Sequence, residues 1–156
     1  MEEAGFKKSS NPKDKASTAR LDLSLFPGSA IMYGALAMTE GHCKYGGYNY
    51  RVDGVSISTY YAALFRHMIK FYSGQWADPE TLVPHLASAL ACIAIIIDGF
   101  TQNNIVDDRP PIQDLGYEFN SMEVLVHHLQ STYPGGPPRF TQEGTEIMEE
   151  TSCKMV

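Results

Sequence analysis

Cysteine is scarce in the 156-residue sequence, which contains only three. Cys43, Cys92 and Cys153 lie far apart and form no CxxC pair, so we expect neither a disulfide framework nor a structural zinc site. Long apolar runs are also missing, because the longest, residues 86–97, falls short of the ~20 residues that span a bilayer. Residues 1–3 lack the pattern of a secretory signal. These absences predict a soluble protein of the reducing cytoplasm with no membrane partner.

Basic residues are in the minority, with 12 Lys+Arg against 18 Asp+Glu and a formal net charge of -6. A protein that binds duplex DNA through its phosphates needs a basic surface, so we expect no direct nucleic-acid binding. The charge is uneven: residues 1–20 hold five basic and three acidic residues, whereas residues 21–156 hold seven basic and fifteen acidic ones. A basic arm therefore precedes an acidic body.

Several motifs that identify enzyme classes are also missing. The sequence has no GxxxxGK(S/T) phosphate loop, GxSxG elbow, HExxH pair or EF-hand loop. P-loop, serine-hydrolase, zinc-protease and calcium-binding interpretations therefore lose their usual support. Any chemistry must come from residues that the fold brings together.

Four segments have the apolar spacing and the end signals of helices. Ser29 is a plausible N-cap for the first, Ser58 and Thr59 for the second, and Asn120 with Glu123 resembles a capping box for the last. The third begins at Pro84 and is apolar on nearly every side as far as Asp98, as expected of a buried core helix. The predicted helices are residues 29–44, 60–72, 84–98 and 120–130.

No alternating apolar pattern is long enough to indicate a strand, so the sequence predicts an all-α bundle of about four helices. Residues 48–54 are expected to be an irregular connection, and residues 99–119 a long one. We divide the chain into a flexible basic arm (1–20), a helical domain (21–140) and an acidic tail (141–156).

Acidic residues that interrupt apolar segments are the first site candidates. Glu40 lies on the first helix, one turn before Lys44, where it could form an exposed ion pair or bind a metal. Asp78, Glu80 and His85 lie within eight residues at the start of the core helix. Two carboxylates and an imidazole suit a divalent ion such as Mg²⁺ or Mn²⁺, while ordinary helix capping is the alternative.

The second helix carries basic residues, and the core helix ends with an acid. Arg66, with Lys70 one turn later, can donate charge-assisted hydrogen bonds to phosphates. His67 is more typical of a satisfied core histidine than of a ligand. Asp98 opposes the helix dipole, so it could pair with Arg66 or face a metal.

The site candidates belong to a longer series of short motifs. In chain order these are Asn11-Pro12-Lys13-Asp14, residues 21–27, Glu40-Gly41, Lys44-Tyr45-Gly46, Asn49-Tyr50-Arg51, Tyr61, Arg66-His67, Gly74, Asp78-Pro79-Glu80, Pro84-His85-Leu86-Ala87, residues 89–98 and Asp107-Asp108-Arg109-Pro110. Taken in order, they resemble the phage-encoded dATP/dGTP diphosphohydrolase family over about residues 11–111. Ser88, which stands where that family has a second histidine after His85, favours the acids as metal ligands.

The family is similar to the MazG-like all-α nucleoside-triphosphate pyrophosphatases. The resemblance implies hydrolysis of dGTP or dATP to the monophosphate and pyrophosphate with Mg²⁺ or Mn²⁺. It also implies a homo-oligomer, dimer or tetramer, in the host cytoplasm, supplying dGMP for 2-aminoadenine phage DNA. We assign catalysis to Glu40 and Glu80, metal ligation to Glu40, Asp78, Glu80, His85 and Asp98, and substrate binding to Lys44, Tyr45, Asn49, Arg66, His67 and Lys13.

Two alternatives stay open. An HD-type triphosphohydrolase would use His67, His85 and Asp98, and would release nucleoside and triphosphate. A helical interaction module would explain the amphipathic helices without any catalytic site.

Overall fold

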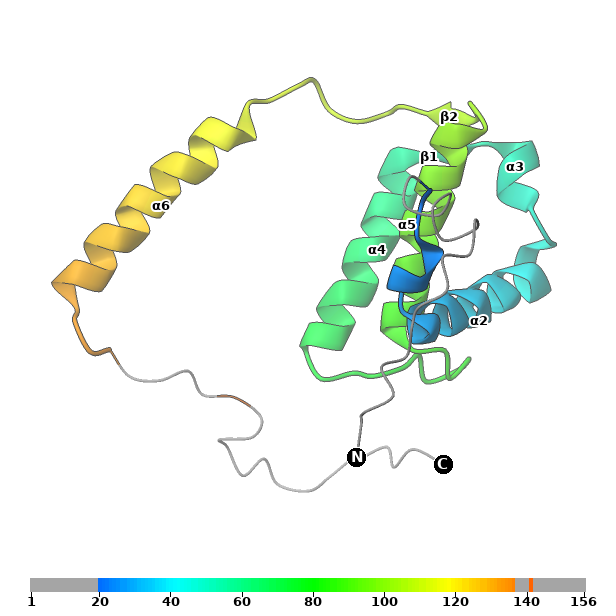
Figure 1. The fold of residues 1–156 in the computed structure, drawn as a ribbon, viewed down its shortest axis with the longest axis horizontal. Coiled ribbons are helices and arrows are strands. Elements are labelled where there is room, and N and C mark those ends of the chain that lie inside the picture. The colour runs from blue at the N-terminus through cyan, green and yellow to red at the C-terminus, as the bar shows by residue number, and fades with distance from the viewer. Residues whose placement is uncertain (1–19, 137–140, 142–156) are drawn as a thin grey trace, which may run out of the picture. The chain divides into compact units, whose positions relative to one another are not determined.

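A computed structural model describes residues 20–136 and residue 141. The described chain is all-α apart from one pair of very short strands (Figure 1). Lys13, nearly all of the arm and nearly all of the tail lie outside the described residues. The elements are η1 (Leu23–Leu25), α2 (Gly28–Tyr45), α3 (Asn49–Asp53), β1 (Val55–Ser56), α4 (Ile57–Tyr72), α5 (His85–Thr101), β2 (Ile105–Val106) and α6 (Leu115–Thr132).

The core of the first unit is built around α5, against which both α2 and α4 pack (Figure 1). Its buried positions are mostly small, including Ala87, Ala89 and Ala91. Small side chains let neighbouring helices approach closely, and Gly34 of α2 lies beside the side chain of Leu90. The predicted core helix is confirmed, and its apolar sequence on nearly every side follows from packing on two helices at once.

The strands β1 and β2 form a parallel pair in which Val55 lies opposite Ile105. They contact α5 at Gly99, where an added Cβ would lie 3.0 Å from Ile105 Cδ1 and 3.1 Å from Val55 Cβ. Val55 is completely buried there. The sequence analysis predicted no strand, because two-residue strands are too short to show alternation.

The helix boundaries differ from the prediction at α3, α4 and α6. Residues 49–53, expected to be irregular, form the short helix α3. The second helix begins at Ile57 instead of Tyr60, because Asp108 supplies its cap from a distant segment. The capping box at Asn120 is wrong: α6 begins at Leu115, after Asp114, whose side chain accepts a hydrogen bond from Tyr117 N at 3.4 Å.

The chain divides into two compact units between Pro110 and Pro111. The first contains α2 to β2, and the second contains α6. Within the described residues, no helix is both long enough and apolar enough to cross a membrane.

Candidate active site

A hollow of about 190 Å³ opens between α2, α4, α5 and the loop that joins α4 to α5. Its walls combine small apolar side chains with groups of both charges. The hollow therefore offers an apolar floor and a charged rim, which suits a polar ligand with an anionic part. The lining residues are Ala37, Glu40, Gly41, Lys44, Tyr45, His67, Asp78, Ser88, Ala91 and Cys92.

The Asp78 carboxylate, in the loop before α5, is held by backbone N–H groups of the residues that follow it. Its Oδ1 accepts hydrogen bonds from Glu80 N at 3.0 Å and from Thr81 N at 3.2 Å. Its Oδ2 lies 4.0 Å from Lys70 Nζ. The two backbone hydrogen bonds, and next the charge of Lys70, hold the pKa of the Asp78 carboxyl below its ordinary value. Asp78 is thus an ionised, fixed carboxylate facing the hollow.

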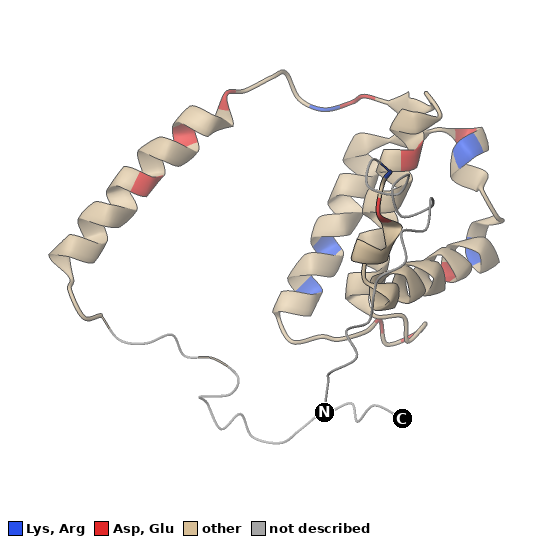
Figure 2. Cartoon of the chain, viewed as in Figure 1, with Lys and Arg blue, Asp and Glu red and all other residues tan. Residues whose placement is uncertain are grey.

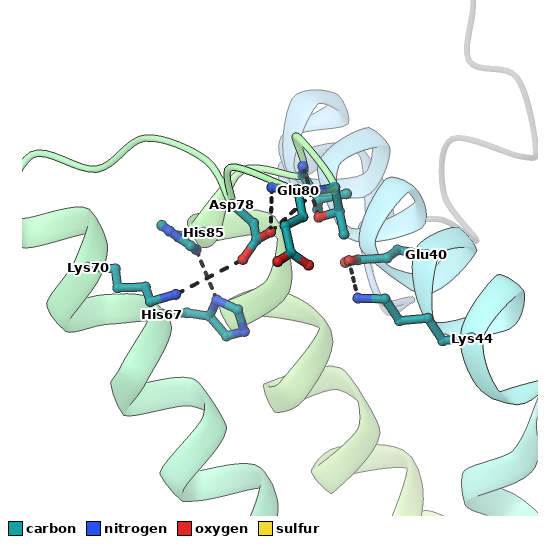
Figure 3. Close-up of polar contacts among 9 residues, drawn as sticks. Glu40, Lys44, His67, Lys70, Asp78, Glu80 and His85 are labelled. Carbon is teal, nitrogen blue, oxygen red and sulfur yellow. Dashed lines mark hydrogen bonds and ion pairs between the residues drawn. The ribbon is translucent and has the colours of Figure 1, made fainter. Parts of the chain in front are cut away.

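The three carboxylates follow one another in Figure 3, with that of Glu80 between those of Asp78 and Glu40. Glu40 Oε1 accepts a hydrogen bond from Lys44 Nζ at 2.6 Å, which confirms the predicted ion pair and raises the pKa of Lys44. Within residues 20–136 the Glu80 carboxylate makes no hydrogen bond or ion pair. Asp78 is thus fixed by hydrogen bonds, Glu40 is paired with Lys44, and Glu80 is free to bind a ligand.

His67 and His85 form a pair on the α4 side of Asp78 (Figure 3). Their Nδ1 atoms lie 3.1 Å apart, and His85 is fully buried with no hydrogen-bond partner at Nε2 among the described residues. Burial, followed for His67 by the charge of His85, lowers the pKa of both rings. The prediction that His67 is a satisfied core histidine agrees with this contact. One Nδ1 donates to the other, and burial favours the neutral form of both rings.

Basic side chains surround the acids. Lys44 follows Glu40 on α2, and Arg66 and Lys70 lie one turn apart on α4, as the blue bands in Figure 2 show. Arg66 is exposed, and its charge lowers the pKa of the Cys92 thiol, which burial raises more strongly. Lys44 therefore brings a positive charge to the lining of the hollow, and Lys70 brings one to Asp78.

Asp98 lies away from this group of acids. It is thirteen positions after His85 on α5, about 20 Å along a helix. Both of its oxygens accept hydrogen bonds from Arg51, at 2.7 Å and 2.8 Å. The expectation that Asp98 pairs with Arg66 is wrong, because α3 brings Arg51 to the C-terminal end of α5.

Of the remaining residues predicted to bind substrate, one lies at the hollow and one does not. Tyr45 lines the hollow and is exposed. Asn49 is the first residue of α3 and lies outside the lining. Ala91 and Cys92 also line the hollow, although the sequence did not mark them as site residues. The small residues Ala87 and Ala91, one turn apart, were the available signal that another helix can approach α5.

The carboxylate and imidazole groups do not form a ready metal cage. Among residues 20–136 and 141, no three side chains of His, Cys, Asp or Glu are gathered closely enough to hold a metal ion. The acids around the hollow therefore define a candidate site by their direction and chemistry rather than by a closed coordination shell.

Comparison with known proteins identifies a family to which the chain is similar. The model of the family "dATP/dGTP diphosphohydrolase, N-terminal" matches residues 10–109, about two thirds of the chain. No curated protein and no solved structure matches. The matched range contains every residue that lines the hollow, and α6 lies beyond it.

Proposed function

The chain belongs to the dATP/dGTP diphosphohydrolase family, and from this premise we propose that it hydrolyses dGTP or dATP to the monophosphate and pyrophosphate. The observation that supports this best is the group of acids at the hollow. Glu40 and Asp78 line it beside Lys44, and the Glu80 side chain lies between these two acids in Figure 3. Phosphoryl chemistry needs positioning and neutralisation of charge, and both are available there.

Mg²⁺ or Mn²⁺ is the cofactor that fits this donor set. Both ions prefer oxygen ligands, and the candidate ligands are the fixed Asp78, the unpaired Glu80 and the Lys44-bound Glu40. Such an ion, when bound, neutralises phosphate oxygens and lowers the pKa of water. Glu40 and Glu80, as the groups that flank the substrate phosphates, are our proposed catalytic residues.

Two of the ligands expected from the sequence fit less well. His85 directs Nδ1 to His67, and Asp98 uses both oxygens on Arg51 at the far end of α5. We therefore centre the metal site on the three carboxylates. The same separation weakens the HD-type alternative, which requires His67, His85 and Asp98 to act together.

The cations act on the triphosphate. Lys44 lies at the hollow and is about half exposed, so it can exchange Glu40 for a phosphate oxygen while the acid turns to a metal. We propose that Arg66, on α4, supplies a second positive charge for the phosphates, and that His67, in the lining of the hollow, contacts the substrate. We propose that Lys13, from the basic arm, adds to this neutralisation, and that Tyr45 and Asn49 contact the base or sugar.

Exposed apolar side chains support a homo-oligomer, either a dimer or a tetramer. On α4, Phe65 and Ile69 are 48% and 62% exposed, and on α5 Ile97 is 58% exposed. Large apolar side chains that are exposed in one chain can be covered by another copy of it. From the family resemblance alone, we further propose a MazG-like assembly in the host cytoplasm that supplies dGMP for 2-aminoadenine phage DNA.

A panel of deoxynucleoside and ribonucleoside triphosphates with Mg²⁺ or Mn²⁺, with products resolved by chromatography, tests the proposal. We expect dGMP or dAMP together with pyrophosphate. Release of deoxynucleoside and triphosphate would instead identify the HD-type reaction. Absence of any product with both metals would favour the interaction module.

A further inference from the structure

The turn between α2 and β1 holds one aromatic ring in an unusual position. Tyr48 has a left-handed backbone, with φ 60° and ψ 19°, which residues with a Cβ rarely adopt. Its side chain is nevertheless 65% exposed, so burial of the ring does not offset the backbone strain. Strained backbone at an exposed position is often associated with a functional site.

Arg51 lies against this ring. The guanidinium carbon is 5.2 Å from the centroid of the Tyr48 ring, within the range of a cation–π contact. Arg51 is itself fixed by its two hydrogen bonds to Asp98. The ring is therefore supported from one side by a cation that an acid on α5 holds in place.

The backbone of the same turn is also fixed. Asn104 Nδ2 donates to Tyr50 O at 3.1 Å and to Arg51 O at 2.7 Å. Val55 N in turn donates to Asn104 O at 3.0 Å. The turn is thus anchored to the end of α5 through side chain and backbone, which is more support than a simple connection requires.

The turn is continuous with the hollow. Tyr45 lines the hollow, and Tyr48 follows within at most about 11 Å of chain. Tyr50 packs beside Tyr48 with ring centroids 6.3 Å apart. Tyr45 and Tyr48 therefore lie close together in the chain, one in the lining of the hollow and one beyond it.

We infer that the Tyr48 ring is the surface on which the purine base of the nucleotide stacks, and that Arg51 is a positioning residue that holds this ring. In this arrangement the Arg51 guanidinium lies on one face of the Tyr48 ring and the purine stacks on the opposite face. Stacking on an aromatic ring tolerates both guanine and adenine, as expected of an enzyme for both purines. The inference rests on the proposed function and names the part of the site that receives the base.

Equilibrium dialysis of the full chain with dGMP, dAMP and dCMP in EDTA tests the stacking without hydrolysis. We expect Tyr48→Ala to weaken the binding of dGMP and dAMP on the order of tenfold and that of dCMP less. Tyr48→Phe should restore purine binding because it keeps the ring. Tyr72→Ala removes another highly exposed tyrosine, at the opposite end of α4, and is the matched control.

The role of Arg51 is tested by a double-mutant cycle. If Arg51 acts through the ring, the Tyr48→Ala, Arg51→Ala double variant should bind dGMP no more weakly than Tyr48→Ala alone. Additive losses would mean that Arg51 contacts the nucleotide directly, and would overturn its positioning role. Circular dichroism and light scattering should show the wild-type fold and mass for each variant.

Three results would overturn the stacking inference. They are equal purine binding by wild type and Tyr48→Ala, equal loss for dGMP and dCMP, or a changed oligomer mass that accounts for the loss. Hydrolysis of dGTP measured in parallel separates the two proposals. If the wild type hydrolyses dGTP but Tyr48→Ala binds dGMP as well as the wild type does, only the stacking inference is overturned. If the wild type binds dGMP but does not hydrolyse dGTP, only the proposed function is overturned.

Discussion

Asp108 caps the N-terminus of α4, although it lies 50 residues after Ser58 in the chain. One carboxylate oxygen accepts a hydrogen bond from Ser58 N at 2.8 Å, and the other accepts from the hydroxyls of Ser56 and Ser58, both at 2.6 Å. A carboxylate at this end of a helix satisfies free N–H groups and complements the helix dipole. Asp108 therefore ties the segment after β2 to the start of α4.

Replacing Asp108 by Asn should lower the Tm by several degrees at neutral pH, because the helix end loses a charged cap. Hydrogen bonds from Ser56 and Ser58 lower the pKa of the Asp108 carboxyl from 3.8 to about 2. The folded state binds fewer protons between these values, so the stabilisation is complete above about pH 4 and is lost as the pH falls toward 2.

Urea unfolding at pH 7 and near pH 3 measures this effect. The difference between wild type and Asp108→Asn should shrink at the lower pH. Asp107→Asn is the matched control, because Asp107 pairs locally with Arg109 and caps no helix. An equal loss in both variants would contradict the capping role.

The His67–His85 pair should make stability depend on pH near neutrality. Burial lowers the pKa of both rings from 6.5, so the folded state binds fewer protons than the unfolded chain. The stabilisation is complete above about pH 7 and decreases as the pH falls below 6.5. Two protonated rings with Nδ1 atoms 3.1 Å apart would also repel each other.

His67→Asn should therefore reduce the fall in Tm between about pH 7.5 and pH 5.5, since it removes one titrating ring and leaves a neutral polar group. Thermal unfolding followed by circular dichroism gives the comparison. His127→Asn, on α6, should leave the fall unchanged. Parallel curves for wild type and His67→Asn would show that the pair does not control the pH dependence.

Gly99→Ala should destabilise the first unit by about 1–3 kcal/mol, the usual cost of overpacking. The new methyl group would lie 3.0 Å from Ile105 Cδ1 and 3.1 Å from Val55 Cβ, and Val55 is completely buried. Gly41→Ala is the matched control because nothing lies within 4 Å of its added Cβ. Alanine has a greater helix propensity than glycine, so Gly41→Ala should stabilise the protein by up to about 1 kcal/mol. Similar unfolding midpoints in urea for the two variants would contradict the packing.

Glu80→Gln and Glu40→Gln should each lower kcat for dGTP hydrolysis by more than about 100-fold, since even outer-shell partners of metal ligands contribute about 10- to 100-fold. Asp98→Asn should retain kcat to within about tenfold, because Asp98 binds Arg51. Initial rates over a Mn²⁺ series test both statements. Glu118→Gln on α6 is the control, and wild-type turnover in Glu80→Gln would refute the assignment.

Lys44→Met should raise the KM for dGTP by about tenfold, because one phosphate-binding charge is lost. Its effect on folding should be small, at most about 0.5 kcal/mol, since Lys44 is about half exposed and its partner Glu40 lies one turn away on the same helix. Steady-state kinetics and urea unfolding separate the two effects. Unchanged KM would show that Lys44 serves only Glu40.

Local sequence signals predicted the parts of the fold that depend on neighbouring residues. The end of the first helix at Gly46 and the buried helix after Pro84 agree with the structure, because caps, prolines and apolar spacing act within a few residues. The N-cap predicted at Ser29 is wrong, because α2 begins at Gly28 after Pro27 and Ser29 is its second residue. The ion pair between Glu40 and Lys44 was also predictable, since residues four apart on a helix lie on one face.

Relationships between distant residues came only from the tertiary structure. No local pattern shows that Asp98 meets Arg51, 47 residues earlier, or that Asp108 caps α4. These contacts arise because α5 returns the chain past α2 and α4, which brings the ends of distant segments together. The residue types of the site were therefore set by the sequence, whereas the packing on α5 decided which acids face the hollow and which hold the fold.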